Sequence, residues 1–171
     1  KILRANGTGV KHPYTVDGAP VAFIQDRNRD GSIVASDGDR VYLYVGMRRG
    51  GNAYYALDVT DKDNPSVKWR SQQPFYGQSW SRPVVTRVDM TDPGLNADKA
   101  VVVIGGGYDT VHDTLAHPLG PDSAGAGIYF LDLQSGAVHR RGPLPSLSFC
   151  LQLRSHDNHP PPCFCLSHPG D

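Results

Sequence analysis

Short runs of alternating apolar and polar residues, separated by turns, recur along most of the chain. Runs that are rich in β-branched and aromatic residues and bounded by Gly, Pro, Asn and Asp predict β-strands. The pattern predicts eight strands: Val21–Gln25, Val41–Met47, Ala53–Val59, Val67–Arg70, Val84–Val88, Ala100–Ile104, Ile128–Leu133 and Val138–Arg140. The sequence therefore predicts an all-β fold.

The predicted strands fall into two similar groups of four. The stretch Asn52–Thr60 is echoed by Gly127–Gln134, and their shared Tyr-x-Leu-Asp motif places Asp132 at an offset of 74 positions from Asp58. Four short antiparallel strands in a repeated unit are typical of β-propeller blades. The alternative is two unrelated meanders that share this motif by coincidence. We predict a partial β-propeller of about two four-stranded blades.

The same pattern divides the chain into four segments. We expect a lead-in segment at 1–19, a first blade at 20–82, a second blade at 83–142 and a tail at 143–171. In the tail the alternation stops, and three consecutive prolines fit neither helix nor strand. We expect this tail to be disordered or non-native and to add nothing to the fold.

Two blades cannot close a ring, because propellers usually have four to eight blades. We therefore expect that the remaining blades are missing from this chain. Blades that lack neighbours expose apolar faces and strand edges, so the isolated chain is expected to be marginally stable and to associate.

Composition excludes several classes of function. Within the 171 residues, 17 Lys and Arg balance 17 Asp and Glu, so no nucleic-acid partner is indicated. No apolar run approaches the roughly 18 residues of a transmembrane helix, and no signal peptide is recognisable at the first residues. All three cysteines (Cys150, Cys163 and Cys165) lie in the tail, so no disulfide framework and no zinc site of common spacing is expected.

The strongest chemical motif is the segment Asp26–Asp37, which matches a twelve-residue calcium loop. Oxygen-bearing residues occupy loop positions one, three, five, seven and twelve, and Gly31 occupies position six, where the backbone must turn sharply. The predicted ligands are Asp26, Asn28, Asp30, Ser32 and Asp37. Asp39 is an alternative to Asp37 as the residue that completes the coordination shell. The cofactor indicated is Ca²⁺.

The alternative for this loop is a plain polar turn between two strands. Because both flanks read as strands, the loop is not part of a helix–loop–helix hand. Arg27 and Arg29 raise the local potential, and Asp37 is one methylene shorter than the usual Glu. We therefore expect weak affinity, about 10⁻⁴ M, as in extracellular calcium modules.

Other candidate chemistries have simpler interpretations. Ser79 lacks the closing glycine of a nucleophile elbow and is interpreted as a turn residue. The triplet Gly105–Gly107 is followed by no lysine and indicates a tight strand exit. His112, Asp113 and His117 match no common metal spacing and are interpreted as solvated polar residues. No catalytic site is predicted.

Five motifs together resemble the PilY-type proteins, which are type IV pilus tip-associated adhesins and biogenesis factors. These motifs are Asp26–Gly31, Val45–Gly51, Tyr54–Thr60, Gly77–Pro83 and Gly105–Thr110. The resemblance implies a C-terminal modified propeller with quinoprotein-like blades and a calcium loop that influences pilus extension and retraction. It also implies an extracellular or outer-membrane setting, with pilus subunits or a host surface as partners. We expect the chain to depart from the family in three ways: it lacks the large N-terminal adhesive region, it lacks the remaining blades, and it ends in an unrelated tail.

A second resemblance points to another class of protein. Asp58 followed by Trp69 is similar to blades of pyrroloquinoline-quinone-dependent dehydrogenases, in which the Trp docks one blade on the next. The alternative function is therefore a fragment of such a dehydrogenase propeller. A full-length reading frame would discriminate the two, through an N-terminal adhesive domain or a quinone pocket.

Overall fold

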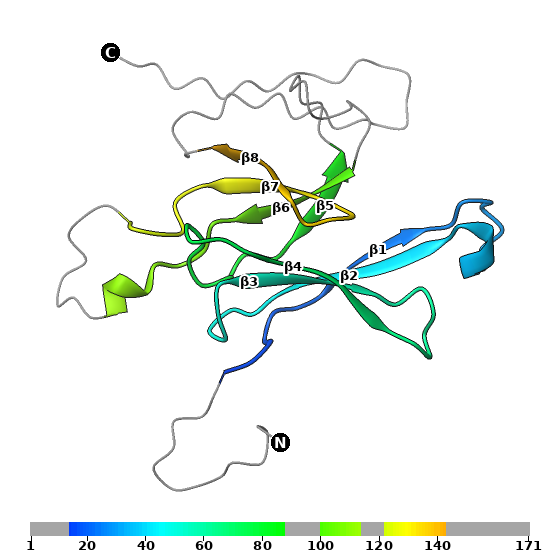
Figure 1. Ribbon diagram of the computed structural model, residues 1–171, viewed down its shortest axis with the longest axis horizontal. Helices are drawn as coiled ribbons and strands as arrows, with labels where there is room; N and C mark the ends of the chain where they lie inside the picture. Colours follow the sequence, from blue (N-terminus) through cyan, green and yellow to red (C-terminus); the bar gives the residue numbers. More distant parts are fainter. Residues whose placement is uncertain (1–13, 88–99, 114–121, 143–171) are drawn as a thin grey trace, which may run out of the picture.

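The computed structural model describes residues 14–87, 100–113 and 122–142. These residues form two four-stranded antiparallel sheets and two short 3-10 turns, and the described part of the chain contains no α-helix (Figure 1). The first sheet comprises β1 (Val21–Gln25), β2 (Arg40–Gly46), β3 (Ala53–Asp58) and β4 (Ser66–Gln72). The second comprises β5 (Val84–Arg87), β6 (Ala100–Gly105), β7 (Ile128–Asp132) and β8 (Val138–Gly142). The 3-10 turns are η2 (Ala35–Asp37) and η3 (Thr110–Asp113).

All eight predicted strands are confirmed, and each observed end lies within two residues of its predicted end. Each sheet follows the order of the chain, so every strand pairs with its sequence neighbour. This simple meander is the strand arrangement of a propeller blade. The two sheets are therefore the blades of a partial propeller.

The repeat extends to an irregularity of the backbone. The pairing of β3 with β4 shifts register between Ala56 and Leu57, and the pairing of β7 with β8 shifts between Phe130 and Leu131. These positions differ by the same 74 residues that separate the two motif aspartates. A bulge in the same place bends both units alike, which favours two copies of one unit over two unrelated meanders.

Aromatic side chains fill the space between the two sheets. Strand register decides which of them face inward, because paired residues share a face and successive residues alternate. Tyr54 pairs with Gly46 and so lies on the same face as Tyr42 and Tyr44, whereas Tyr55 lies on the opposite face. The structure buries Tyr42, Tyr44 and Tyr54, whereas Tyr55 is half-buried. The buried residues of this cluster are Tyr42, Tyr44, Tyr54, Ala56, Trp69, Tyr76, Val102, Ile104, Tyr129, Leu131 and Leu133.

Polar atoms of these aromatic side chains bind backbone groups of the opposite sheet. The indole N–H of Trp69 and the hydroxyl of Tyr44 both donate to the carbonyl of Leu133, each at 3.1 Å. The Tyr54 hydroxyl donates to the Gly105 carbonyl at 3.3 Å. Burial raises the pKa of Tyr44 and of Tyr54, which keeps both phenols protonated as donors. Trp69 thus docks one blade on the next, as the quinoprotein resemblance implied.

The remaining segments are described in part. In the lead-in segment, the N–H of Gly18 donates to the Gly46 carbonyl at 3.1 Å, which joins this segment to the end of β2. Residues 1–13 and the predicted tail at 143–171 lie outside the described residues. Among the described residues, no helix has the length and hydrophobicity to cross a membrane.

We predict that Tyr44→Phe lowers the free energy of unfolding by about 0.5–1.5 kcal/mol, the net value of one hydrogen bond. The ring stays in place, and the Leu133 carbonyl keeps its bond from Trp69, so no buried acceptor is left without a partner. Urea denaturation followed by tyrosine and tryptophan fluorescence measures this change. Tyr55→Phe, on the opposite face, is the control and should change the midpoint little. An equal loss in both variants would contradict the docking role.

Candidate metal centre

The predicted calcium loop joins β1 to β2, so it is a strand-to-strand loop as predicted. Gly31 at loop position six has φ +83°. This left-handed conformation is unfavourable for residues that carry a Cβ atom, and a glycine accommodates it without strain. η2 forms the last turn of the loop, just before β2.

Short-range hydrogen bonds fold the first half of the loop. The carboxylate of Asp26 accepts the N–H groups of Arg29 at 2.6 Å and Gly31 at 2.8 Å. The Asp30 carboxylate accepts the N–H of Ser32 at 2.7 Å. These Asx-type bonds curl the backbone around the polar side chains. Ser32 is therefore placed beside Asp30 through its backbone.

Three predicted ligands come together at one point of the loop. The side-chain amide N–H₂ of Asn28 donates to Asp30 Oδ2 at 3.0 Å and to Asp37 Oδ2 at 3.3 Å. Two carboxylates thus lie on either side of the Asn28 amide, and the same amide carries an oxygen that is a good calcium ligand. Both carboxylate oxygens of Asp26 accept backbone N–H groups, whereas Asp30 uses one oxygen in this way and directs the other to Asn28.

Asp39 serves a different purpose from Asp37. Its side chain is fully buried, and its two oxygens accept the N–H of Arg27 at 2.8 Å and the N–H of Val34 at 2.9 Å. These two backbone hydrogen bonds hold the pKa of Asp39 below its usual range. Asp39 therefore joins the two ends of the loop, while Asp37 lies beside the other candidate ligands.

A second group of possible ligands was missed by sequence reasoning. One ligand atom from each of Asp109, His112 and Asp122 lies within 4.8 Å of the others, and this group could hold a metal ion. His112 Nε2 lies 2.6 Å from Asp122 Oδ1. His112 was predicted to be a solvated residue, but only 17% of its side chain is exposed. The sequence carries only a weak signal for this group of possible ligands, because Asp122 is distant from His112 along the chain and the fold brings the two together.

Asp109 is already engaged by neighbouring donors. Its Oδ2 accepts the N–H and the hydroxyl of Ser123 at 2.6 and 2.7 Å, and its Oδ1 accepts the N–H of Val111 at 3.0 Å. These bonds hold the pKa of Asp109 well below its usual range. Asp113 is separate from this group, because it accepts the hydroxyl of Tyr108 at 2.8 Å. His117 lies outside the described residues.

Ser79 is buried and is part of the framework of the fold. Its hydroxyl accepts the N–H of Met47 at 2.8 Å and lies 2.9 Å from the Ala53 carbonyl and 3.0 Å from the Gly51 carbonyl. A hydroxyl with these partners connects the β2–β3 turn to the segment that follows β4. This position agrees with the interpretation of Ser79 as a structural residue.

Paired four-stranded meanders with an aromatic layer between them place the chain among β-propeller-type proteins. Comparison with curated proteins found the type IV pilus biogenesis factor PilY1 of Pseudomonas aeruginosa. The proteins of strains PAO1 and PAK are 32% identical over 143 residues, which cover 81% of this chain and 10% of the relative. That of strain UCBPP-PA14 is 28% identical over 144 residues. The chain therefore spans about a tenth of the length of the curated relatives it matches.

A solved structure agrees with the sequence matches. The crystal structure of the P. aeruginosa PilY1 C-terminal domain aligns with a TM-score of 0.51 and 27% identity, covering 75% of this chain and 22% of that one. A scan of protein-family models found no match. This chain is a PilY-type sequence that corresponds to part of the C-terminal domain, as the motif resemblance indicated.

We predict that the stability contributed by Asp39 depends on pH. Because its folded pKa lies below the ordinary value of about 3.9, this contribution is complete above that value and is lost as the pH falls through the folded pKa. Asp39→Asn keeps one acceptor oxygen and loses the charge. The variant should therefore be less stable than the parent at pH 6, and the difference should shrink at pH 3. Urea midpoints at both pH values measure it.

Asp63→Asn is the matched control for this experiment. Asp63 is exposed and its side-chain partner is Lys62, so this variant should follow the parent at both pH values. A gap between Asp39→Asn and the parent that is the same at pH 3 and pH 6 would refute the pH dependence.

Proposed function

We propose that this chain is a calcium-binding propeller segment of a type IV pilus biogenesis protein. The observation that supports calcium binding most directly is the convergence of Asp30 and Asp37 on the side chain of Asn28 within a twelve-residue loop pattern. The similarity to PilY1 supports the pilus role. Asp26, Asn28, Asp30, Ser32 and Asp37 are the proposed ligands, and the site is non-enzymatic.

The chemistry of the donor set fits a hard cation. Ca²⁺ is bound by six to eight oxygens at 2.3–2.6 Å, and carboxylate, amide and backbone carbonyl oxygens all serve. In this loop the partially positive Asn28 amide group lies between the Asp30 and Asp37 carboxylates. A cation there would be held by the Asp30 and Asp37 carboxylates and by the side-chain oxygen of Asn28, which in this structure accepts the N–H of Asp30 at 3.1 Å. Mutual repulsion of the carboxylates opposes the same arrangement when no cation is bound.

The loop is connected to the interface between the blades through β2. Asp39, which joins the ends of the loop, directly precedes β2. Two residues of that strand, Tyr42 and Tyr44, reach the second sheet, where their hydroxyls bind the Gln134 side chain and the Leu133 carbonyl. Calcium binding therefore orders a loop that leads into the docking strand, and its effect reaches the contact between blades.

In the whole protein this effect provides a route from calcium concentration to pilus behaviour. We propose that the calcium state of the loop influences pilus extension and retraction through the propeller. The setting is extracellular or associated with the outer membrane and pilus, and the partners are pilus subunits or a host surface. At such locations a site with a Kd of about 10⁻⁴ M is filled at millimolar calcium.

We predict that calcium stabilises the folded chain by about 0.4 kcal/mol when its concentration equals Kd and by about 1.4 kcal/mol at tenfold excess. Magnesium should stabilise less, because it requires a stricter octahedral shell and loses water reluctantly. Calorimetric titration and thermal unfolding at increasing calcium concentration measure both effects. Asp30→Ala should abolish the response.

Two further variants locate the site. Asp63→Ala removes an exposed aspartate from another acidic turn and should leave the calcium response intact. His112→Gln disrupts the Asp109–His112–Asp122 group, so a response that survives in this variant and disappears in Asp30→Ala assigns the ion to the loop. Loss of the response in His112→Gln alone would move the site to the second group. Absence of both heat and stabilisation at millimolar calcium would refute calcium binding.

A further inference from the structure

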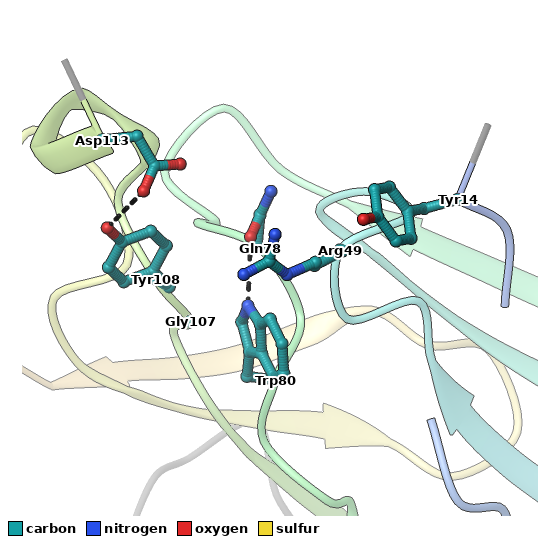
Figure 2. Close-up of a pocket in the computed structure, with 7 residues that line it drawn as sticks. All are labelled: Tyr14, Arg49, Gln78, Trp80, Gly107, Tyr108 and Asp113. Atoms are coloured by element: carbon teal, nitrogen blue, oxygen red, sulfur yellow. Dashed lines mark hydrogen bonds between the residues drawn. The ribbon is translucent and has the colours of Figure 1, made fainter. Parts of the chain in front are cut away.

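A hollow of about 670 Å³ lies at one end of the two blades, away from the calcium loop. Figure 2 shows the side chains that line it, which come from the β2–β3 connection, the β4–β5 connection, the segment after β6 and the lead-in segment. Its volume is within the range of 300–1,000 Å³ that is usual for binding sites. The lining residues are Tyr14, Arg49, Gln78, Trp80, Gly107, Tyr108 and Asp113.

The aromatic side chains of this hollow are unusually exposed. Tyr14 is 59% exposed, and Trp80 and Tyr108 are each 39% exposed. The tyrosines between the blades, by contrast, are almost fully buried. Tyr, Trp and Arg are the residues that are most enriched at the energetic centres of protein–protein interfaces. Three exposed aromatic rings around one hollow therefore indicate a recognition surface.

Arginine side chains lie against these rings. The guanidinium carbon of Arg49 lies 5.9 Å from the ring centre of Trp80 and 5.8 Å from that of Tyr14, and the Arg48 guanidinium lies 4.9 Å from Trp80. Such cation–π contacts orient a guanidinium without using its N–H donors. Within residues 14–87, 100–113 and 122–142, no carboxylate lies within 4.0 Å of the Arg49 guanidinium. Its planar set of donors is available to a ligand.

The other side of the hollow is fixed and has the opposite charge. The hydroxyl of Tyr108 donates to Asp113 Oδ1 at 2.8 Å (Figure 2). Gln78 Oε1 accepts the indole N–H of Trp80 at 3.0 Å, which holds the indole in place. A ligand whose carboxylate reaches Arg49 therefore lies near the rings of Trp80 and Tyr108, which these hydrogen bonds hold in place. A second carboxylate near Asp113 is disfavoured because the two negative charges repel.

We propose that this hollow binds an acidic peptide segment of a partner protein. One side-chain carboxylate of the peptide accepts two hydrogen bonds from the Arg49 guanidinium, and a neighbouring apolar side chain packs on the exposed ring of Tyr108. A guanidinium pairs with a carboxylate in this bidentate way better than an ammonium does. A saccharide is less suitable, because stacking of a sugar needs an open ring face and the guanidinium groups already lie against Trp80 and Tyr14. The proposal does not depend on calcium binding.

The test uses the whole chain in the presence of EDTA and two blocked peptides, acetyl-Phe-Glu-Gly-amide and acetyl-Phe-Gln-Gly-amide. Binding is followed through the indole N–H resonance of Trp80 at low and high salt. We expect the Glu peptide to bind at least about tenfold more tightly than the Gln peptide, which corresponds to about 1.4 kcal/mol. High salt should reduce this preference.

Arg49→Gln should remove the preference for Glu, and Arg70→Gln should retain it. Arg70 is a matched control because its guanidinium lies 5.9 Å from the ring of Tyr55, on the other face of the first sheet. Urea midpoints of both variants show that each is folded, and since Arg49 is exposed its substitution should not change the midpoint. Equal affinity for the two peptides, or an unchanged preference in Arg49→Gln, overturns the proposal. Saturation by an oligoglucuronate in the absence of peptide binding also overturns it.

Discussion

The carbonyl of Leu133 is the point at which two aromatic side chains of the first blade bind the second blade. It follows the last residue of β7 and accepts hydrogen bonds from two side chains of the other sheet, Trp69 and Tyr44. A buried indole or phenol that finds no acceptor lowers the stability of the fold. Burial of Trp69 and Tyr44 therefore depends on the end of β7, because this end places the Leu133 carbonyl within reach of both donors. The aromatic layer of the first blade therefore requires the second blade, and each sheet completes its core on a neighbour.

This dependence explains why the motif Tyr-x-Leu-Asp appears at the end of β3 and of β7. In the second blade the tyrosine and leucine are buried, whereas in the first they are half-buried on the outward face. In both blades the aspartate closes the turn: Asp58 accepts the N–H of Thr60 and Asp132 accepts the N–H of Gln134, both at 3.0 Å. Such closure fixes where the strand stops. In the second blade the stopping point also aims the Leu133 carbonyl at the first blade. A turn residue thus determines whether an interface between sheets can form.

The strands and their grouping could be predicted because they depend on local alternation and on a repeat, both of which a sequence displays directly. The faces of Tyr54 and Tyr55 could not be assigned, since they depend on which residue of β2 lies opposite. Asp30 and Asp37 could be predicted as candidate ligands because calcium loops have fixed spacing. Their anchor was not found, because Asp39 acts through backbone N–H groups that have no sequence signature.

Long-range groups form a second class of features that sequence reasoning missed. Asp122 lies beside His112, and Arg49 lies against both the lead-in residue Tyr14 and Trp80 of the β4–β5 connection. In each case the spacing along the chain was uninformative because the contact depends on how the strands bring distant connections together.

The outward face of the first sheet is the one opposite to the face that packs against the second blade. Register places Val45 and Tyr55 opposite each other on that face, and Arg70 lies over the Tyr55 ring. A guanidinium on a long aliphatic stem can cover an aromatic ring and keep its charge in water, so this face is partly protected when no neighbour is present. On the inward face Lys68 Nζ lies 4.5 Å from the ring centre of Tyr42, but the other aromatic rings of that face are buried by the second blade. The two faces of the first sheet therefore differ. The inward face binds the second blade through directional hydrogen bonds. The outward face can receive a further blade, as in the assembly of a propeller.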